Sequence, residues 1–354
     1  MRTDDFDYTL PPELIAQAPA IPRDSCRLLV LNRATGRLEH RHFTDILDYL
    51  DPGDLLVVNE TRVLPARLQG TRSGGGVAEL LLLKQENAAA DETETGALWE
   101  CLARPGRRIR PGDHLNFGAG HLSAEILERR SEGRRLVRFT CDSGTVAEAL
   151  HKYGETPLPP YITQDLDNPE LYQTVYANAA DEHSAAAPTA GLHFTPGLLE
   201  VAAARGIGLA RLRLDVGLDT FRPVTEDDPD EHVIHTEYYY LPPEAAAAIN
   251  ATHAAGRRVI AVGTTVVRAL ESAARNLGPS APLAPIGAPT DLYILPGFDF
   301  RVVDALITNF HVPRSTLVML VSAFASREQI LNAYQEAVKQ RYRFFSFGDA
   351  MLIL

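Results

Sequence analysis

The sequence predicts an α/β fold in which a discontinuous sheet domain carries a small inserted antiparallel β-barrel. Three observations lead to this prediction. Between about residues 65 and 140, short strands alternate with turn signals, and no amphipathic helix interrupts them. From about residue 146 onward, helices and strands alternate along the chain. The apolar run at 55–58, which precedes the barrel region, has the composition of a buried strand of the same sheet.

The barrel domain is expected to span residues 67–140, and the α/β domain residues 1–66 and 141–354. Turn signals such as Arg104-Pro-Gly separate the short strands of the barrel region, which is the spacing typical of small antiparallel barrels. Its expected strands are 77–84, 99–103, 113–117, 122–127 and 136–139.

The α/β domain is expected to contain helices with recognisable ends. Thr195 can cap a helix that has Pro196 at its first position, and Gly206 can end it. The expected helices are 168–176, 195–205, 243–255, 264–275 and 327–340. The expected strands are 208–214, 259–262, 292–295 and 305–307. The expected loops are 86–96 and 278–289.

The composition favours a globular enzyme of the cytoplasm. The chain has 354 residues, of which 45% are hydrophobic, enough to fill a core. Its 3 cysteines are widely spaced and match neither a disulfide framework nor a zinc site. The longest apolar run, 317–325, is far shorter than the ~18–20 residues of a membrane span, so no membrane partner is expected. The net charge of −12 argues against a protein that coats nucleic acid, but it permits a local basic patch.

Four junctions between apolar segments and loops carry polar residues. The first follows the strand at 55–58 and contains Asn59, Glu60 and Arg62. Because ligands bind at the carboxyl ends of strands in open α/β sheets, this junction can bind a ligand. A charged turn with an internal contact between Glu60 and Arg62 explains it equally well.

The second junction brings His193 and Phe194 to the start of a helix, after the small residues Thr189, Ala190 and Gly191. Free N–H groups at a helix start favour an anion, and small residues let a ligand approach the main chain. A structural histidine, a core phenylalanine and tight packing at the glycine are the alternatives.

The third and fourth junctions each lie between an apolar strand and a helix. Gly263, Thr264 and Thr265 precede a helix that carries Arg268, which suits a carboxylate or a ribose, although a plain β–α connection has the same pattern. In the fourth, Asn309, His311 and Arg314 precede a helix that Ser315 can cap. Together the four junctions predict one polar cleft at one edge of the sheet.

His232, His235 and Glu237 lie close together in the sequence and raise the possibility of a metal site. In a strand, His235 and Glu237 share a face while His232 points to the other side. We therefore expect no metal, and interpret His235 and Glu237 as an acid–base or substrate-positioning pair.

Arginines concentrate in the barrel region. A dense local cluster can bind phosphates even on an acidic protein, whereas a solvated face explains any single arginine. The cluster consists of Arg104, Arg107, Arg108, Arg110, Arg129, Arg130, Arg134, Arg135 and Arg138.

Irregular motifs along nearly the whole chain resemble one known family. They are Pro22-Arg23-Asp24, Asn59-Glu-Thr-Arg-Val, Arg104-Pro-Gly, Pro157-Leu-Pro-Pro-Tyr-Ile, Tyr172-Gln-Thr-Val-Tyr, Ala187-Pro-Thr-Ala-Gly-Leu-His-Phe-Thr, Thr220-Phe-Arg-Pro-Val, Gly263-Thr-Thr, Thr308-Asn-Phe-His and Tyr342-Arg-Phe-Phe-Ser-Phe-Gly-Asp-Ala-Met-Leu. In these motifs the chain resembles the S-adenosylmethionine:tRNA ribosyltransferase-isomerase family of queuosine biosynthesis.

The resemblance implies an α/β domain with an inserted β-barrel and a reaction without a metal or prosthetic group. The ribosyl part of S-adenosylmethionine, a co-substrate, would be transferred to 7-aminomethyl-7-deazaguanine at the wobble position of a tRNA and rearranged, giving epoxyqueuosine, adenine and methionine. No protein partner is implied. The alternatives are a metal-dependent hydrolase that uses His232, His235 and Glu237, and a non-catalytic tRNA-binding paralogue.

The sequence departs from the family pattern at four positions. Glu60 stands where aspartate is expected and Arg314 where lysine is expected, and both keep the charge. Asp215 replaces a histidine, and Asp219 a small residue. A carboxylate at 215 would titrate near ~4 if unperturbed, so it could serve as a base but would be a poor general acid at neutral pH.

The reaction requires a base for the carbon beside the sulfonium and donors for the alkoxides that form. Candidate acids and bases are His193, His235, Glu237, His311 and Glu60. Candidate substrate-binding residues are Asn59, Arg62, Thr189, Gly191, Phe194, Gly263, Thr264, Thr265, Arg268, Asn309 and Arg314. Candidate tRNA-binding residues are Arg104, Arg107, Arg108 and Arg110.

Overall fold

The computed structural model describes residues 1–86, 96–217, 223–275, 277–278 and 281–354. The chain divides into two compact units. The larger unit comprises residues 1–62, 159–181 and 187–354, and the smaller unit residues 63–158 and 182–186. Each unit is described by itself.

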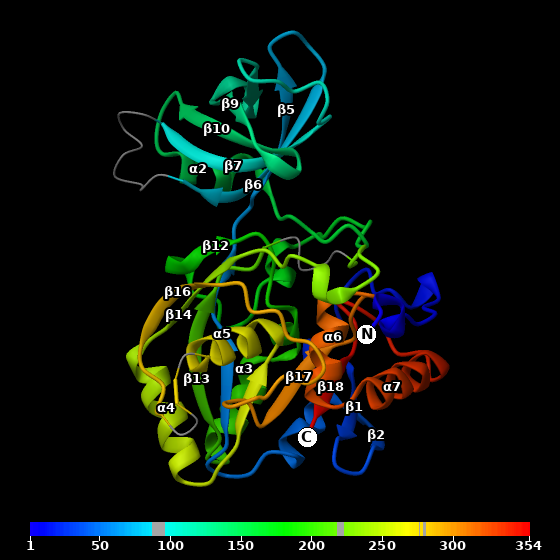
Figure 1. Cartoon of the computed structure of the whole chain (residues 1–354). Coiled ribbons are helices and arrows are strands. Elements are labelled where there is room, and N and C mark those ends of the chain that lie inside the picture. The colour runs from blue at the N-terminus through cyan, green and yellow to red at the C-terminus, as the bar shows by residue number, and fades with distance from the viewer. Residues whose placement is uncertain (87–95, 218–222, 276, 279–280) are drawn as a thin grey trace. The chain divides into compact units, whose positions relative to one another are not determined.

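A nine-stranded sheet forms the centre of the larger unit, counted within the described residues (Figure 1). The strand order is β16–β14–β13–β3–β15–β17–β18–β1–β2. The bounds are β1 Arg27–Asn32, β2 Arg37–His42, β3 Leu55–Asn59, β13 Gly208–Leu214, β14 Glu237–Leu241, β15 Val259–Val262, β16 Ile286–Thr290, β17 Ala305–Asn309 and β18 Ala350–Ile353. The predicted strand at 55–58 therefore does belong to the same sheet as the later strands.

Four adjacent strands, β13, β3, β15 and β17, run parallel to one another. Their carboxyl ends consequently lie at one edge of the sheet. The ends of β3, β15 and β17 carry the first, third and fourth polar junctions. The strands β3, β15 and β17 are buried along their whole length, as expected of parallel strands covered on both faces.

Helices cover the sheet, and their ends are set by local chemistry. The bounds are α3 Pro196–Ala204, α4 Pro243–Ala254, α5 Thr264–Ala274, α6 Thr316–Phe324 and α7 Arg327–Lys339. The side chain of Thr195 accepts a hydrogen bond from the Leu198 N–H, and Ser315 caps α6 in the same way. Leu198 of α3 packs in one core cluster with the sheet residues Leu56 and Ile260.

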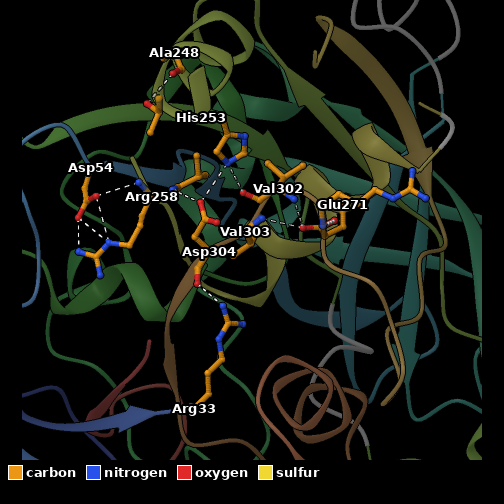
Figure 2. A network of polar contacts seen from close by, with 12 residues as sticks. Arg33, Asp54, Ala248, His253, Arg258, Glu271, Val302, Val303 and Asp304 are labelled. Carbon is orange, nitrogen blue, oxygen red and sulfur yellow. Dashed lines mark hydrogen bonds and ion pairs between the residues drawn. The ribbon is translucent and has the colours of Figure 1, made fainter. Parts of the chain in front are cut away.

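The opposite edge of the parallel strands is fixed by a polar network (Figure 2). Asp54, just before β3, accepts hydrogen bonds from the guanidinium of Arg258, just before β15. Asp304, just before β17, accepts a 2.8 Å hydrogen bond from the Val259 N–H. The Glu271 carboxylate of α5 accepts hydrogen bonds from three consecutive backbone N–H groups at 301–303. This network ties the amino ends of the strands together, away from the polar junctions.

The smaller unit contains a closed six-stranded antiparallel barrel among its described residues. The strand order is β5–β6–β7–β10–β9–β8, and pairing of β5 with β8 closes it. The bounds are β5 Arg67–Arg72, β6 Val77–Gln85, β7 Ala97–Arg104, β8 His114–Phe117, β9 Leu122–Arg129 and β10 Arg134–Cys141. Alternate residues point into the barrel core, as the period of two requires. The fold class that the sequence predicts is thus confirmed.

Short elements complete the smaller unit. Helix α2, Val146–Tyr153, is capped by Thr145, and strand β11, Gly154–Glu155, pairs with β5. Strands β4, Arg62–Val63, and β12, Glu182–Ser184, form a separate two-stranded sheet.

Two predicted elements are wrong. The predicted helix 168–176 is only a 3₁₀ turn, Pro169–Tyr172, because the Arg23 guanidinium takes the carbonyls of Glu170 and Gln173. The predicted strand 292–295 is absent from the described residues, since the Leu292 carbonyl accepts a hydrogen bond from Arg268 instead of a neighbouring strand.

The predicted loops have different outcomes. The predicted loop 278–289 is wrong at its end, because residues from 286 onward belong to β16, which pairs with β14. Most of the loop at 86–96, residues 87–95, lies outside the described residues.

Candidate functional site

A pocket of about 560 Å³, including its open mouth, lies at the carboxyl edge of the parallel strands. Three of the four polar junctions contribute to its wall. They supply Thr189 and Ala190, then Gly263, Thr264 and Thr265, and then Asn309, His311 and Ser315. These residues come together because β15 and β17 are adjacent parallel strands.

The turn from β15 into α5 presents backbone and hydroxyl groups to the pocket. Gly263 occupies the N-cap position of α5 with a φ of +99°, a conformation that favours glycine. Because glycine has no side chain, it cannot cap the helix. The first N–H groups of α5 are therefore not capped by that residue and can meet an anion. Thr265 is 7% exposed, and its Oγ1 has no hydrogen-bond partner among the described residues.

Asn309 organises the wall formed by β17. Its Nδ2 donates to the Phe345 carbonyl at 3.0 Å and lies 3.2 Å from the His193 Nε2. Its Oδ1 accepts a hydrogen bond from the Thr189 Oγ1 at 3.3 Å. The amide therefore joins two separate segments, residues 189–193 and the loop at Phe345, to β17 beside the pocket.

His311 is a titratable side chain in the pocket wall. Its Nε2 lies 2.8 Å from the Thr308 Oγ1, and its backbone N–H donates to the Tyr334 hydroxyl. Burial lowers the pKa of His311 to about 3. The imidazole is consequently neutral near pH 7 and a weak base there, and it can form hydrogen bonds with a ligand without being charged.

His193 lies behind the pocket wall. It is 4% exposed, its Nδ1 lies 3.2 Å from the Cys26 Sγ, and its Nε2 contacts Asn309 of the pocket wall. Burial, with the charges of Arg343 and Arg23, lowers its pKa to about 3. Burial also raises the pKa of the Cys26 thiol to about 12. Both groups are therefore uncharged near pH 7, and His193 is not a protonated acid there.

The neighbours of His193 are used for packing. A Cβ on Gly191 would lie 2.0 Å from the Tyr176 hydroxyl oxygen, so tight packing explains the glycine. Phe194 is fully buried and makes an edge contact with Phe43 at 5.0 Å between ring centroids. Neither Gly191 nor Phe194 lines the pocket.

The first junction does not line this pocket either. The side chain of Asn59 binds the neighbouring strand: its Nδ2 donates to the Leu214 carbonyl and its Oδ1 accepts from the Leu214 N–H. Glu60 is half-buried 3.9 Å from Arg211, and burial raises its pKa. Arg62 forms an ion pair with Glu170.

His235, Glu237 and Arg268 form a buried cluster beside a second, smaller pocket. The His235 Nε2 lies 3.0 Å from one Glu237 oxygen, and Arg268 pairs with the other. Burial acts to raise the pKa of Glu237, but Arg268, His235 and the Gly217 N–H outweigh it and hold that pKa at about 2. Glu237 is consequently an anion that orients its partners.

The structure separates His232 from this cluster. Its Nδ1 lies 3.0 Å from a Glu226 carboxylate oxygen. Within the described residues, no group of three or more His, Cys, Asp or Glu side chains is arranged to hold a metal ion.

Three of the family departures, Glu60, Arg314 and Asp215, do not line the pocket wall. Arg314 has a φ of +57°, and its Nε lies 3.5 Å from an Asp4 oxygen. Asp215 lies 3.5 Å from the Arg213 guanidinium. Asp219 and the Thr220-Phe-Arg segment lie outside the described residues.

Sequence reasoning missed part of the wall. Tyr161, Val216, Phe345 and Ser346 also line the pocket, and the Tyr161 hydroxyl lies 2.8 Å from the Ser346 Oγ. Two motifs that carry the family resemblance, those beginning at Pro157 and Tyr342, contain three of these residues. That overlap was the signal available.

The barrel arginines fall into two groups. Arg104, the last residue of β7, is exposed and lies 3.9 Å from a Glu79 carboxylate oxygen, and Arg107, Arg108 and Arg110 are exposed on the loop that follows it. In contrast, the half-buried arginines Arg130, Arg134 and Arg138 form ion pairs with glutamates. Arg135 is buried and donates to backbone carbonyls. The accessible positive charge of the cluster therefore lies on this loop, on Arg104 and on the exposed Arg129.

The mixed sheet, the polar pocket at its strand ends and the inserted barrel define an α/β enzyme with a barrel insertion. The family model of the queuosine biosynthesis protein matches residues 3–353. The chain belongs to this family.

Relatives match over their full length. The chain is 54% identical to an S-adenosylmethionine:tRNA ribosyltransferase-isomerase of Moorella thermoacetica, with 100% of both chains covered. It is 50% identical to the protein of that name from Staphylococcus haemolyticus, again over 100% of both. A crystal structure of S-adenosylmethionine tRNA ribosyltransferase from Thermotoga maritima matches 99% of this chain and 100% of its own, with 40% identity and a TM-score of 0.56. Among the described helices, none is long and apolar enough to cross a membrane.

Proposed function

We propose that the protein is an S-adenosylmethionine-dependent tRNA ribosyltransferase-isomerase. It transfers the ribosyl part of S-adenosylmethionine to 7-aminomethyl-7-deazaguanine in the anticodon of a tRNA and rearranges it, giving epoxyqueuosine with release of adenine and methionine. The observation that carries this proposal is full-length identity of 50–54% to enzymes of that name. S-adenosylmethionine acts as a co-substrate, and no prosthetic group is needed. Because the other substrate is a tRNA, the expected location is the cytoplasm.

The pocket at the strand ends is the proposed site for S-adenosylmethionine. The α5 N–H groups and the hydroxyls of Thr264 and Thr265 offer donors for the ribose oxygens and for alkoxides that form during rearrangement. His311 is the side chain that we propose to stabilise developing negative charge in this pocket, because its neutral imidazole lines the wall and Thr308 orients it. His193 supports the site through Asn309.

The exposed arginine loop of the barrel is the proposed contact for tRNA phosphates. Arg104, Arg107, Arg108 and Arg110 provide a cationic surface on a protein whose net charge is −12. A polyanion is held by local charge, so the overall acidity does not oppose this role.

The direct test is to incubate the protein with S-adenosylmethionine and tRNA that carries 7-aminomethyl-7-deazaguanine. Adenine release and the modified nucleoside are followed by mass spectrometry, and both are expected in equal amounts. Binding of the tRNA without turnover would favour the non-catalytic paralogue. The same reaction in a chelator should proceed fully, whereas a stoichiometric metal requirement would favour the hydrolase.

A further inference from the structure

A second pocket of about 280 Å³, including its open mouth, adjoins the first at the start of α6. Leu317 lines both pockets. The walls of the second pocket are mainly apolar and include Leu292, Ile294 and Leu320. The charged group in this wall is Arg268, with His235 beside it. The pocket therefore combines apolar walls with a buried cation.

Arg268 has a hydrogen-bonding group that its neighbours leave unused. The side chain is 5% exposed, its Nε donates to the Leu292 carbonyl, and its Nη1 pairs with Glu237. Its Nη2 has no hydrogen-bond partner among the described residues. A buried guanidinium donor without a partner is costly, so an acceptor in this pocket would relieve that cost.

Glu237 balances the charge of Arg268 but does not satisfy that donor. One Glu237 oxygen already accepts from the Gly217 N–H and contacts His235, and the other contacts the Nη1 of Arg268. A ligand with one negative charge suits such a site. A doubly charged phosphate would meet the Glu237 carboxylate at close range and be repelled.

The two pockets are linked by the geometry of α5. Thr264 and Thr265 face the first pocket, and Arg268, one turn further along the helix, lies in the wall of the second. Residues at i and i+4 lie on the same face of a helix, so Thr264 and Arg268 can contact one extended ligand. Such a ligand would place donor-seeking oxygens in the first pocket and end in an anion in the second.

We propose that the second pocket receives the methionyl arm of S-adenosylmethionine and that the Arg268 Nη2 donates to its carboxylate, an assignment that rests on the proposed function. The methylene groups of the arm contact the apolar wall, and the ribose lies in the first pocket. Arg268 thereby selects a co-substrate that carries a carboxylate. Glu237 and His235 hold the guanidinium in the required orientation.

The test compares S-adenosylmethionine with its decarboxylated form, which keeps the sulfonium and the amino group but lacks the carboxylate. By calorimetry, the wild-type protein should bind S-adenosylmethionine about 10- to 100-fold more tightly than the decarboxylated form. Arg268→Lys keeps a cation for Glu237 but lacks the Nη2 donor, so this preference should fall to about threefold or less. The matched control, Thr265→Val in the first pocket, should weaken both ligands alike and leave the preference unchanged.

A second variant keeps the test valid if Arg268→Lys does not fold. Ile234 is half-buried in the wall of the second pocket and takes no part in the ion pair. Ile234→Trp should fill the pocket and weaken S-adenosylmethionine binding at least tenfold. Binding of 5′-methylthioadenosine, which lacks the arm, should stay within about threefold.

The outcomes separate this inference from the proposed function. Tight binding of S-adenosylmethionine without a preference for the carboxylate overturns the subsite and leaves the proposed function standing. A preference that survives Arg268→Lys also overturns it. Failure of the wild-type protein to bind S-adenosylmethionine at all would contradict the proposed function itself.

Discussion

The Nε2 atom of His193 lies 3.2 Å from the Nδ2 atom of Asn309. The same Nδ2 donates to the Phe345 carbonyl, which can only accept, so this atom is the amide nitrogen and it donates to His193 as well. The proton of His193 is then on Nδ1, facing the Cys26 sulfur. A buried neutral imidazole thus fixes the orientation of an amide in the pocket wall.

We expect His193→Ala to lower turnover by roughly 10²-fold, because Asn309 loses the acceptor that orients it. His193→Gln should restore part of the activity, since its Oε1 can accept from Asn309. The pH–rate profile should be the same in both variants and the wild type, because His193 does not titrate near neutral pH. A changed profile in His193→Gln would show instead that His193 exchanges protons with the substrate.

The depressed pKa of His193 predicts a pH dependence of stability. The unfolded chain takes up a proton on this histidine below about pH 6.5, whereas the folded protein does so only near pH 3. The unfolded state therefore binds more protons in this range, and the free energy of unfolding falls as the pH is lowered. His193 alone contributes up to about 1.4 kcal/mol per pH unit.

Urea unfolding between pH 7 and pH 4.5 measures this dependence. His193→Gln should flatten the decline, whereas the control His42→Gln, at an exposed position, should keep the wild-type decline. Equal declines in the two variants would mean that His193 is already protonated in the folded protein.

The network at the opposite edge of the sheet predicts a loss of stability without a loss of chemistry. Asp54 is buried against Arg258, whose side chain is one-third exposed, so Asp54→Asn should lower the free energy of unfolding by about 1–3 kcal/mol. Asp51→Asn, which removes an exposed partner of the same arginine, should have an effect below about 1 kcal/mol. The kcat of both variants should match the wild type, and a tenfold fall in Asp54→Asn would mean that this edge reaches the site.

The pKa of Asp54 adds a pH signature to that prediction. Burial acts to raise this pKa, but hydrogen bonds from Arg258 and nearby N–H groups outweigh it and lower the pKa. The stabilisation is present above the pKa of an unfolded aspartate and is lost as the pH falls through the lower folded value. The difference in stability between wild type and Asp54→Asn should therefore shrink on acidification.

The exposed barrel loop predicts a salt-dependent contribution to tRNA binding. Replacing Arg107 and Arg108 together by alanine should weaken binding of an anticodon stem-loop and reduce the salt slope by up to about two phosphates' worth. The paired arginines Arg130 and Arg138, changed together, should alter the slope less, because glutamates already neutralise them. Fluorescence titration at several salt concentrations measures the slope. An unchanged slope in the first variant would leave the loop merely solvated.

The sequence predicted what depends on neighbours along the chain. Helix α3 follows from the Thr195 cap and its apolar stripe, and the barrel follows from its turn spacing. The local hairpin of β1 and β2 was missed because β2 is mostly polar, whereas the pairing of β1 with β18 was missed because the two strands are more than 300 residues apart. Periodicity cannot reveal such a pairing. The segment 292–295 is apolar because it packs beside Arg268, and not because it is a strand.

The same distinction applies to the site. The convergence of Gly263 and Asn309 follows from parallel strands, whose ends meet at one edge. The internal use of Asn59 depends on the register between β3 and β13, which brings Leu214 beside it. The environment of His193 depends on Cys26, which is 167 residues away. Neither relationship leaves a local mark on the sequence.

The position of β18 sets an order on folding during translation. The barrel segment 63–158 emerges from the ribosome before most of the large sheet and contains all six strands of the barrel. The large sheet cannot be completed until residues 350–353 have been made, because in the described sheet β18 lies between β17 and β1 and pairs with both. The nascent chain can therefore carry a complete barrel while the large sheet still lacks β18. Asn309 pairs with Ala350, so this part of the pocket wall cannot complete its strand pairing until residue 350 has been made.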